Sequence, residues 1–167
     1  AGDSVLILLP GAERPDGVAD LLRRALPRIG ARGIPGDPAA DPKLFRKEVE
    51  RYRPQCLVAA PSQLRRLLEG LESPPNLRAV LSSAEPLPDD VRGALAARWG
   101  CAVFDHYGLT ETGYGGGVEC PSHDGYHLRE ADLYWEVIDP FSGEPVPDGT
   151  PGEVVFTTLT RRAMPLI

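Results

Sequence analysis

The amino-acid sequence predicts an α/β fold with a mostly parallel sheet of βα repeats, followed by β-hairpin material. Short apolar runs alternate with amphipathic segments over the first two-thirds of the 167 residues. The 18 glycines and 18 prolines lie between these segments, where they form turns. Two strand-like runs, 132–139 and 153–159, follow instead of further repeats. We therefore expect an α/β subdomain over residues 1–125 and a β-rich continuation over residues 126–167.

The predicted strands of the first part are short, continuous apolar runs. They cover residues 5–9, 56–60, 77–81 and 102–104. Such runs are typical of strands that are buried on both faces of a parallel sheet. Parallel strands need crossover connections, and the carboxyl ends of the strands are where such sheets bind ligands.

The predicted helices lie between these strands. They cover residues 18–26, residues 45–52, the segment that carries Leu64, Leu67, Leu68 and Leu71, and residues 88–99. We expect Ser62 to cap the third helix, and Gly30 and Gly100 to end the first and the last. In the β-rich part, Tyr134 and Trp135 are expected to pack against a sheet rather than to line an aryl pocket.

Charge and composition exclude several classes of protein. The 24 acidic and 18 basic residues give a formal charge of −6, so the chain lacks the basic footprint of a nucleic-acid-binding protein. The sequence contains no run of about 18 apolar residues, so we expect no membrane span. It also contains no secretory signal, so we expect a cytoplasmic location. Because the sequence begins without Met and stops within apolar residues, we expect a piece of a longer protein. Its oligomeric state stays open.

Two polar segments follow consecutive predicted strands and are candidates for chemistry. Residues 82–86 follow one strand, although a polar loop that caps the next helix is an alternative interpretation. Residues 105–113 follow the next strand. Here Tyr107 can stack on a base, Thr110 can donate to phosphate and Glu111 can hold a hard cation such as Mg²⁺. A glycine-rich turn with a packed tyrosine is the alternative for this second segment.

These segments carry a resemblance to a known family. Tyr107-Gly108-Leu109-Thr110-Glu111 matches the Tyr-Gly-x-Thr-Glu motif of the adenylate-forming, or acyl-CoA synthetase, superfamily. Upstream, Ser83-Ala84-Glu85-Pro86 resembles the Gly-Ala-Glu-Pro segment of phenylacetate–CoA ligases, with Ser83 in place of glycine. Four further segments are similar to that group: residues 136–140, 143–149, 152–160 and 163–167.

The resemblance implies that both parts of the chain belong to an AMP-binding domain. It implies an ATP-dependent ligase that activates a carboxylic acid, of an aryl, phenylacetate-like type, as an acyl-adenylate and transfers it to CoA. Thr110 and Glu111 take catalytic roles, and Glu111 binds Mg²⁺. The residues implied to bind the cofactor ATP or AMP are Ser83, Ala84, Glu85, Pro86, His106, Tyr107, Gly108 and Thr110.

The resemblance also implies that parts of the site lie outside this chain. The family's phosphate loop is expected before Ala1, and its Arg-Tyr-Arg-Thr-Gly-Asp segment and C-terminal domain after Ile167. We therefore expect the isolated chain to be inactive. Two alternatives remain open: a degenerate nucleotide-binding or zinc-stabilised interaction module, and an adenylating enzyme with an acceptor other than CoA.

A zinc site is predicted separately, from the spacing of cysteines and histidines. Cys120, His123 and His127 form a C-x₂-H-x₃-H pattern, which is compatible with Zn²⁺. Cys101 or His106 is the expected fourth ligand. Surface histidines beside an ordinary thiol are the alternative. Cys56 lies within an apolar run and is expected to behave as a small hydrophobic residue.

Overall fold

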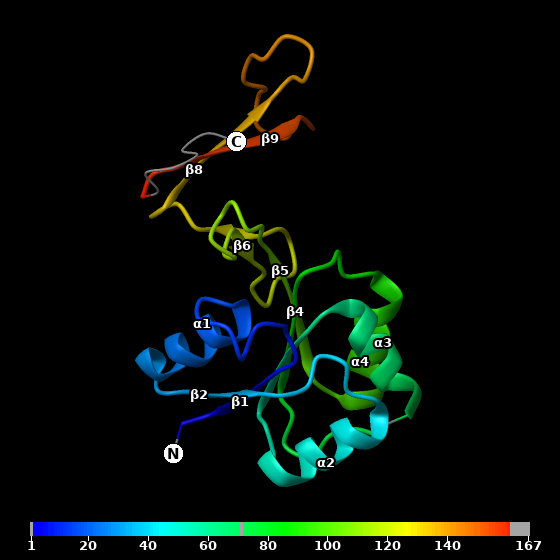
Figure 1. Cartoon of the computed structure of the whole chain (residues 1–167). Coiled ribbons are helices and arrows are strands. Elements are labelled where there is room, and N and C mark those ends of the chain that lie inside the picture. The colour runs from blue at the N-terminus through cyan, green and yellow to red at the C-terminus, as the bar shows by residue number, and fades with distance from the viewer. Residues whose placement is uncertain (1, 71, 161–167) are drawn as a thin grey trace.

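A computed structural model describes residues 2–70 and 72–160. Within this part of the chain, one sheet has seven strands in the order β2-β1-β3-β4-β5-β6-β7, and β8 and β9 form a second sheet (Figure 1). The first five strands in this order are parallel to one another. Strand β6 pairs antiparallel with β5, and β7 pairs antiparallel with β6. The strands of the large sheet are β1 Ser4–Ile7, β2 Arg32–Pro35, β3 Cys56–Ala59, β4 Ala79–Ser82, β5 Ala102–Tyr107, β6 Gly117–Val118 and β7 His127–Leu128. The predicted α/β class with a mostly parallel sheet is confirmed.

Helices cover both faces of the large sheet. They are α1 Val18–Ala25, continued by the 3₁₀ turn η1 Leu26–Ile29, then α2 Pro42–Tyr52, α3 Pro61–Gly70 and α4 Asp89–Trp99. Figure 1 shows α1 on one side of the sheet and the other three helices on the opposite side. The longest of these helices have 11 residues, and within the described residues no helix has the length and apolar character that a membrane crossing requires.

The core consists of two apolar clusters, one on each face of the sheet. Leu6 of β1 packs into the cluster under α2, α3 and α4, whereas its neighbour Ile7 packs with Ala19 of α1. Both strand residues are fully buried. This explains why the strands are continuous apolar runs: successive side chains point to opposite faces, and each face is covered by helices.

The structure differs from the sequence prediction mainly in three strands and one helix cap. The edge strand β2 was not predicted, because Ile34 is its one buried residue and its Arg, Gly and Pro carry no apolar signal. Strands β6 and β7 were not predicted because each has two residues, too few for a pattern of alternation. Ser62 does not precede α3 but lies within its first turn. There the Ser62 N–H and hydroxyl donate to the carboxylate of Glu85, at 3.1 and 2.7 Å. The predicted helical residue Leu71 lies outside the described residues.

The predicted hairpin is present at the end of the described chain. Strand β8 Leu133–Ile138 pairs antiparallel with β9 Glu153–Thr158, from Leu133 opposite Thr158 to Ile138 opposite Glu153. The large sheet continues through β7 to Leu128, beyond the boundary expected at residue 125. Residues 163–167, one of the segments that carry the resemblance, lie outside the described residues.

Candidate functional site

A cavity of about 340 Å³ lies at the carboxyl ends of β1, β4 and β5. This is the edge at which open parallel sheets bind ligands. Six of the predicted site residues line it: Ser83, Ala84, His106, Gly108, Thr110 and Glu111. The parallel pairing of β4 with β5, which places Ser82 beside Asp105, brings the two polar segments together.

A second cavity of about 340 Å³ adjoins the first. Five residues line both cavities: Leu9, Val18, Ser83, His106 and Tyr114. The remaining walls of the second cavity are mainly apolar and come from α1 and the sheet: Leu21, Leu22, Ala25, Val58 and Leu81. Arg129 is the one cation in this lining among the described residues. We call the first cavity the polar cavity, because it contains Thr110 and Glu111 beside its apolar residues, and the second the apolar cavity; the two share one wall.

The shared wall contains a hydrogen bond between Ser83 and His106. The Ser83 hydroxyl lies 3.0 Å from Nδ1 of His106. Burial lowers the pKa of His106, and the nearby carboxylate of Asp105 offsets this only in part. The imidazole is therefore neutral at pH 7 and presents a polar but uncharged group to both cavities. The next residue, Ala84, has a φ of 75°, a left-handed conformation that is unusual for a residue with a Cβ atom.

Glu85 and Pro86 lie outside the cavity lining, although both were predicted to bind the cofactor. Both residues are exposed. The carboxylate of Glu85 accepts two hydrogen bonds from Ser62, in the first turn of α3. The free N–H groups of a first helical turn need such acceptors. In this structure the Glu85 side chain therefore caps a neighbouring helix.

The loop after β5 directs Thr110 and Glu111 toward the polar cavity. The buried Thr112 closes this loop, because its Oγ1 accepts from the Leu109 N–H and donates to the Leu109 carbonyl, both at 2.9 Å. Gly108 is required here, since a Cβ atom would lie 2.8 Å from Cε1 of His106. Thr112 was not among the predicted residues, although its role is local.

The donor set at Glu111 fits Mg²⁺ bound together with a nucleotide. Mg²⁺ sites commonly combine one or two carboxylates with substrate phosphates and water. Glu111 supplies one carboxylate in the cavity lining, and Thr110 beside it supplies a hydroxyl. Within residues 2–70 and 72–160, no three His, Cys, Asp or Glu side chains are grouped to hold a metal by themselves.

Tyr107 does not line the polar cavity but lies in an aromatic cluster. Its ring centroid is 6.3 Å from that of Tyr126 and 6.1 Å from that of Trp135, and the rings are tilted. Trp135 in turn packs on Phe156 of β9, so the expected packing against a sheet is observed for Trp135, whereas Tyr134 is mainly exposed. Tyr107 remains 39% exposed, which leaves ring surface available for stacking.

Gly116, which precedes β6, and Gly117, the first residue of β6, make room for this aromatic cluster. A Cβ atom at Gly116 would lie 3.0 Å from Cδ1 of Tyr107, and one at Gly117 would lie 3.0 Å from Cβ of Tyr126. At these two positions the absence of a side chain lets aromatic side chains of the protein lie directly on the backbone.

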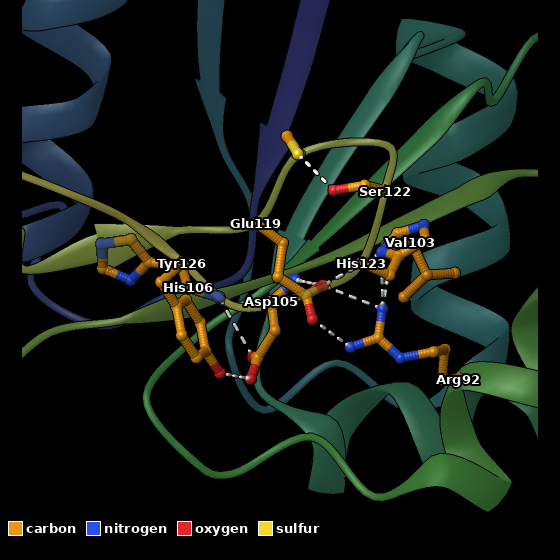
Figure 2. Close-up of polar contacts among 9 residues, drawn as sticks. Arg92, Val103, Asp105, His106, Glu119, Ser122, His123 and Tyr126 are labelled. Atoms are coloured by element: carbon orange, nitrogen blue, oxygen red, sulfur yellow. Dashed lines mark hydrogen bonds and ion pairs between the residues drawn. The ribbon is translucent and has the colours of Figure 1, made fainter. Parts of the chain in front are cut away.

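A network of polar side chains joins α4, β5 and the segment after β6 (Figure 2). Arg92 of α4 donates to both carboxylate oxygens of Glu119, at 2.8 and 2.9 Å, and to the Val103 carbonyl at 2.9 Å. Glu119 also accepts from the Asp105 N–H at 2.8 Å. Asp105 accepts from the Tyr126 hydroxyl at 2.6 Å. Apart from Asp105, which belongs to the candidate segment 105–113, none of these residues was predicted as functional, because the contacts join positions that are 11 to 27 residues apart.

The predicted zinc ligands do not come together as one site, although Cys120 and His127 lie close enough to interact. Cys101 is buried in the apolar cluster beneath α2, α3 and α4. His123 contacts Glu119 through Nδ1 at 3.3 Å, whereas Cys120 contacts Ser122 at 2.9 Å. His106, the other proposed fourth ligand, bonds Ser83. The spacing of these residues is compatible with Zn²⁺, but apart from the pair of Cys120 and His127 their side chains lie in separate environments. The described residues gather no three of them, so the structure gives this prediction no support.

The three thiols differ in their electrostatic environment. Hydrogen bonds from Ser122, followed by the effect of His127, lower the pKa of Cys120 to about 7. Burial raises the pKa of both Cys56 and Cys101. Cys120 is therefore the thiol that ionises most readily, and the predicted apolar character of Cys56 agrees with its surroundings.

Comparison with known proteins extends these observations. The family model described as AMP-binding enzyme matches residues 28–159. The phenylacetate-coenzyme A ligase of Aromatoleum evansii is 38% identical over 127 residues, which are 71% of this chain and 29% of that protein. The enzyme of the same name from Escherichia coli K12 is 35% identical over 152 residues, or 84% of this chain and 34% of that protein. The chain thus spans about a third of the length of these relatives.

The fold is also that of a solved CoA ligase. An open conformation of 2-hydroxyisobutyryl-CoA ligase, in complex with 2-HIB-AMP and CoA, superimposes with a TM-score of 0.83 at 22% identity. The match covers 99% of this chain and 38% of that protein. At this level of identity the likeness concerns the arrangement of helices and strands.

Proposed function

Because the chain belongs to the family of AMP-binding enzymes, we propose that it forms substrate-binding walls of an ATP-dependent acid–thiol ligase. This ligase activates a carboxylic acid as an acyl-adenylate and then transfers the acyl group to CoA. The observation that carries the proposal is the pair of adjoining cavities at the carboxyl ends of β1, β4 and β5. Identity of 35–38% to phenylacetate-coenzyme A ligases supports the reaction class.

The polar cavity is proposed to receive the phosphates of ATP. The hydroxyl of Thr110 donates to a phosphate oxygen, and the carboxylate of Glu111 holds Mg²⁺ against the phosphates. The bound ion supplies neutralisation of phosphate charge. Positioning and charge neutralisation suffice for this chemistry, in which a carboxylate oxygen bonds to the α-phosphorus and the bond to pyrophosphate breaks.

The adenine is proposed to stack on the exposed ring surface of Tyr107, the last residue of β5. Ala84 and Pro86, in the turn after the neighbouring strand β4, are proposed to border the base. Aromatic rings commonly bind bases in this way, because every base offers a flat π face. The Glu85 side chain is committed to α3 in this structure, so we assign the adenine contacts to its neighbours.

The apolar cavity is proposed to receive the acyl part of the acid. Its walls from α1 and the sheet are aliphatic, which favours an aryl or other apolar group over a charged one. The neutral imidazole of His106 lies where the two cavities meet. The carboxylate of a bound acid is therefore placed at this junction, facing the phosphates.

One experiment on the full-length protein tests both the adenylation reaction and the acceptor of the acyl group. The full-length protein is incubated with phenylacetate, ATP and Mg²⁺, with and without CoA, and the products are identified by mass spectrometry. We expect acyl-adenylate without CoA and acyl-CoA with it. Adenylate that persists unchanged with CoA indicates another acceptor, and no adenylate from any aryl acid supports a non-catalytic binding module.

The isolated chain is proposed to bind nucleotide weakly and not to catalyse, since it spans about a third of its relatives. Pyrophosphate release by the chain alone would contradict this. The cytoplasmic location expected from the sequence stays a prediction, which cell fractionation can test.

A further inference from the structure

We propose that Tyr126 and Asp105 are positioning residues for the nucleotide: the hydrogen bond between them holds the Tyr126 ring beside Tyr107, and so fixes the Tyr107 ring for stacking. This inference rests on the proposed role of Tyr107 in adenine binding. Neither Tyr126 nor Asp105 lines the two cavities. Their effect on the ligand is therefore expected to pass through Tyr107.

The Asp105 carboxylate is placed to hold a single orientation of Tyr126. Asp105 is 7% exposed, and its Oδ2 accepts from the Tyr126 hydroxyl at 2.6 Å. Its Oδ1 accepts from the His106 N–H at 3.0 Å. Among the described residues, Asp105 has no ion-pair partner within 4.0 Å, so the Tyr126 hydroxyl is its main side-chain donor. Removing such a donor leaves an oxygen of the buried carboxylate without a hydrogen-bond partner, which costs folding free energy.

The Tyr126 hydroxyl stays protonated and can act as this donor at any physiological pH. Burial and the hydrogen bond to Asp105 raise the pKa of Tyr126 to about 12. Tyr126 is otherwise 42% exposed, so packing alone leaves its ring free to rotate toward solvent. The bond to Asp105 removes that freedom.

Asp105 is itself held by the ion pair between α4 and the segment after β6. The Asp105 N–H donates to Glu119 at 2.8 Å, and the Glu119 N–H donates to the Asp105 carbonyl at 3.0 Å. Arg92 binds both oxygens of Glu119. Figure 2 shows Arg92, Glu119, Asp105 and Tyr126 in one continuous chain of contacts. These contacts thereby fix the orientation of Tyr126 relative to α4, which packs on the core.

The Tyr126 ring reaches Tyr107 over a glycine backbone. The two ring centroids are 6.3 Å apart and the rings are tilted by 57°, at a centroid distance that is typical of interacting aromatic pairs. Trp135 contacts Tyr107 at 6.1 Å, and Gly116 leaves the Tyr107 ring in contact with the backbone. Tyr107 is thus confined by Tyr126, Trp135 and Gly116. A ring confined before the ligand arrives loses less freedom on binding, which strengthens binding.

The test uses four forms of the full-length protein: the wild type, Tyr126→Phe, Tyr107→Ala and the double variant. Calorimetric titration with ATP measures affinity, and steady-state assays measure KM for ATP and kcat separately. Tyr126→Phe keeps the ring and removes only the hydroxyl. Tyr134→Phe is the matched control, because Tyr134 is 57% exposed and its hydroxyl has no hydrogen-bond partner within the described part of the chain.

We expect Tyr126→Phe to weaken ATP binding about tenfold, the effect of one hydrogen bond to a charged acceptor. KM for ATP rises in parallel, while kcat changes by less than about twofold. In the Tyr107→Ala background, Tyr126→Phe causes no further loss, since Tyr126 acts through Tyr107. Tyr134→Phe binds ATP as the wild type does. A purely structural role would lower the thermal unfolding midpoint without this dependence on Tyr107.

Unchanged ATP affinity in Tyr126→Phe, or an equal loss with and without Tyr107, overturns the positioning role. A Tyr107→Ala variant that binds ATP as tightly as the wild type instead overturns the proposed adenine site. The two failures are therefore distinguishable.

Discussion

The Ser83 hydroxyl and Nδ1 of His106 lie 3.0 Å apart, and this contact joins the ends of β4 and β5 where the two cavities meet. Ser83 begins the segment that resembles the Gly-Ala-Glu-Pro segment of phenylacetate–CoA ligases, and His106 directly precedes the segment that resembles the Tyr-Gly-x-Thr-Glu motif. Ser83 replaces the glycine usual there. Its hydroxyl gives His106 a partner that glycine lacks, so the substitution orders the shared wall rather than opening it.

The depressed pKa of His106 predicts a stability that depends on pH. In the unfolded chain His106 titrates near 6.5, whereas burial lowers its pKa in the fold. Below pH 6.5 the unfolded state therefore binds more protons, so stability is full above that pH and falls as the pH is lowered. The thermal midpoint of the wild type should drop between pH 7.5 and 5.5, and the drop should be smaller in His106→Gln.

The matched control for that measurement is His127→Gln, which replaces an exposed histidine. It should retain the pH dependence of the wild type. An identical pH dependence in wild type and His106→Gln would show that the ring does not titrate as its burial requires.

Glu85 is predicted to act on the stability of α3 rather than directly on the nucleotide. Glu85→Ala removes both acceptors from Ser62 and should lower the free energy of unfolding by about 1 kcal/mol, as for the loss of a helix cap. KM for ATP should change by less than about twofold. Chemical denaturation and steady-state kinetics measure the two quantities, with Glu144→Ala in the exposed hairpin turn as control. A large rise in KM at unchanged stability would return Glu85 to the nucleotide site.

The ion pair of Arg92 with Glu119 is predicted to be a major contributor to stability. Glu119 has 9% of its side chain exposed and Arg92 has 26%. Glu119→Gln should destabilise the protein by about 2–3 kcal/mol, somewhat less than the removal of one member of a fully buried pair. Denaturant unfolding at pH 7 measures this, and Glu130→Gln, at an exposed site, should have little effect. A cost equal to that of Glu130→Gln would contradict the role of the pair.

The same pair predicts a loss of stability in acid. Burial alone would raise the pKa of Glu119, but the hydrogen bonds from Arg92, Asp105 and His123 outweigh it and lower the pKa. Its contribution is therefore present at neutral pH and is lost as the pH falls below about 4.5 and through the lower value of the folded state. The difference in stability between wild type and Glu119→Gln should shrink over that range.

Cys120 is predicted to be the most reactive of the three thiols. Its pKa of about 7 gives it substantial thiolate at neutral pH, whereas burial raises the pKa of Cys56 and Cys101. Iodoacetamide at pH 7 should label one of these three thiols in the native protein and all three after denaturation, as peptide mass mapping can show. Cys120→Ser should abolish the native labelling. Faster labelling of Cys56 or Cys101 would contradict the electrostatic account.

The strands of the sheet were predictable because their burial is recorded in the sequence. Leu6 and Ile7 are both apolar since both faces of β1 are covered. The edge strand β2 escaped prediction, because its pairing with β1 demands little from its side chains. The local sequence likewise predicted that Tyr107, Thr110 and Glu111 follow a strand over residues 102–104. In the structure this strand, β5, continues to Tyr107.

The contacts that support the site were not predictable, because they join distant positions. Asp105 and Tyr126 are 21 residues apart, and Ser62 and Glu85 are 23 apart. The zinc prediction shows that residues close in sequence need not form a site. Cys120 and His123 have suitable spacing, yet spacing does not determine side-chain direction, and His123 turns to Glu119 while Cys120 lies beside Ser122.

Exchange of labelled pyrophosphate into ATP tests most directly whether this cavity pair supports acid-dependent adenylation. In the full-length protein we predict exchange that requires phenylacetate or a related apolar acid, and that falls at least about a hundredfold in Glu111→Gln, the loss typical of a charge-stabilising group. Exchange that is independent of acid, or that survives unchanged in Glu111→Gln, would contradict the account.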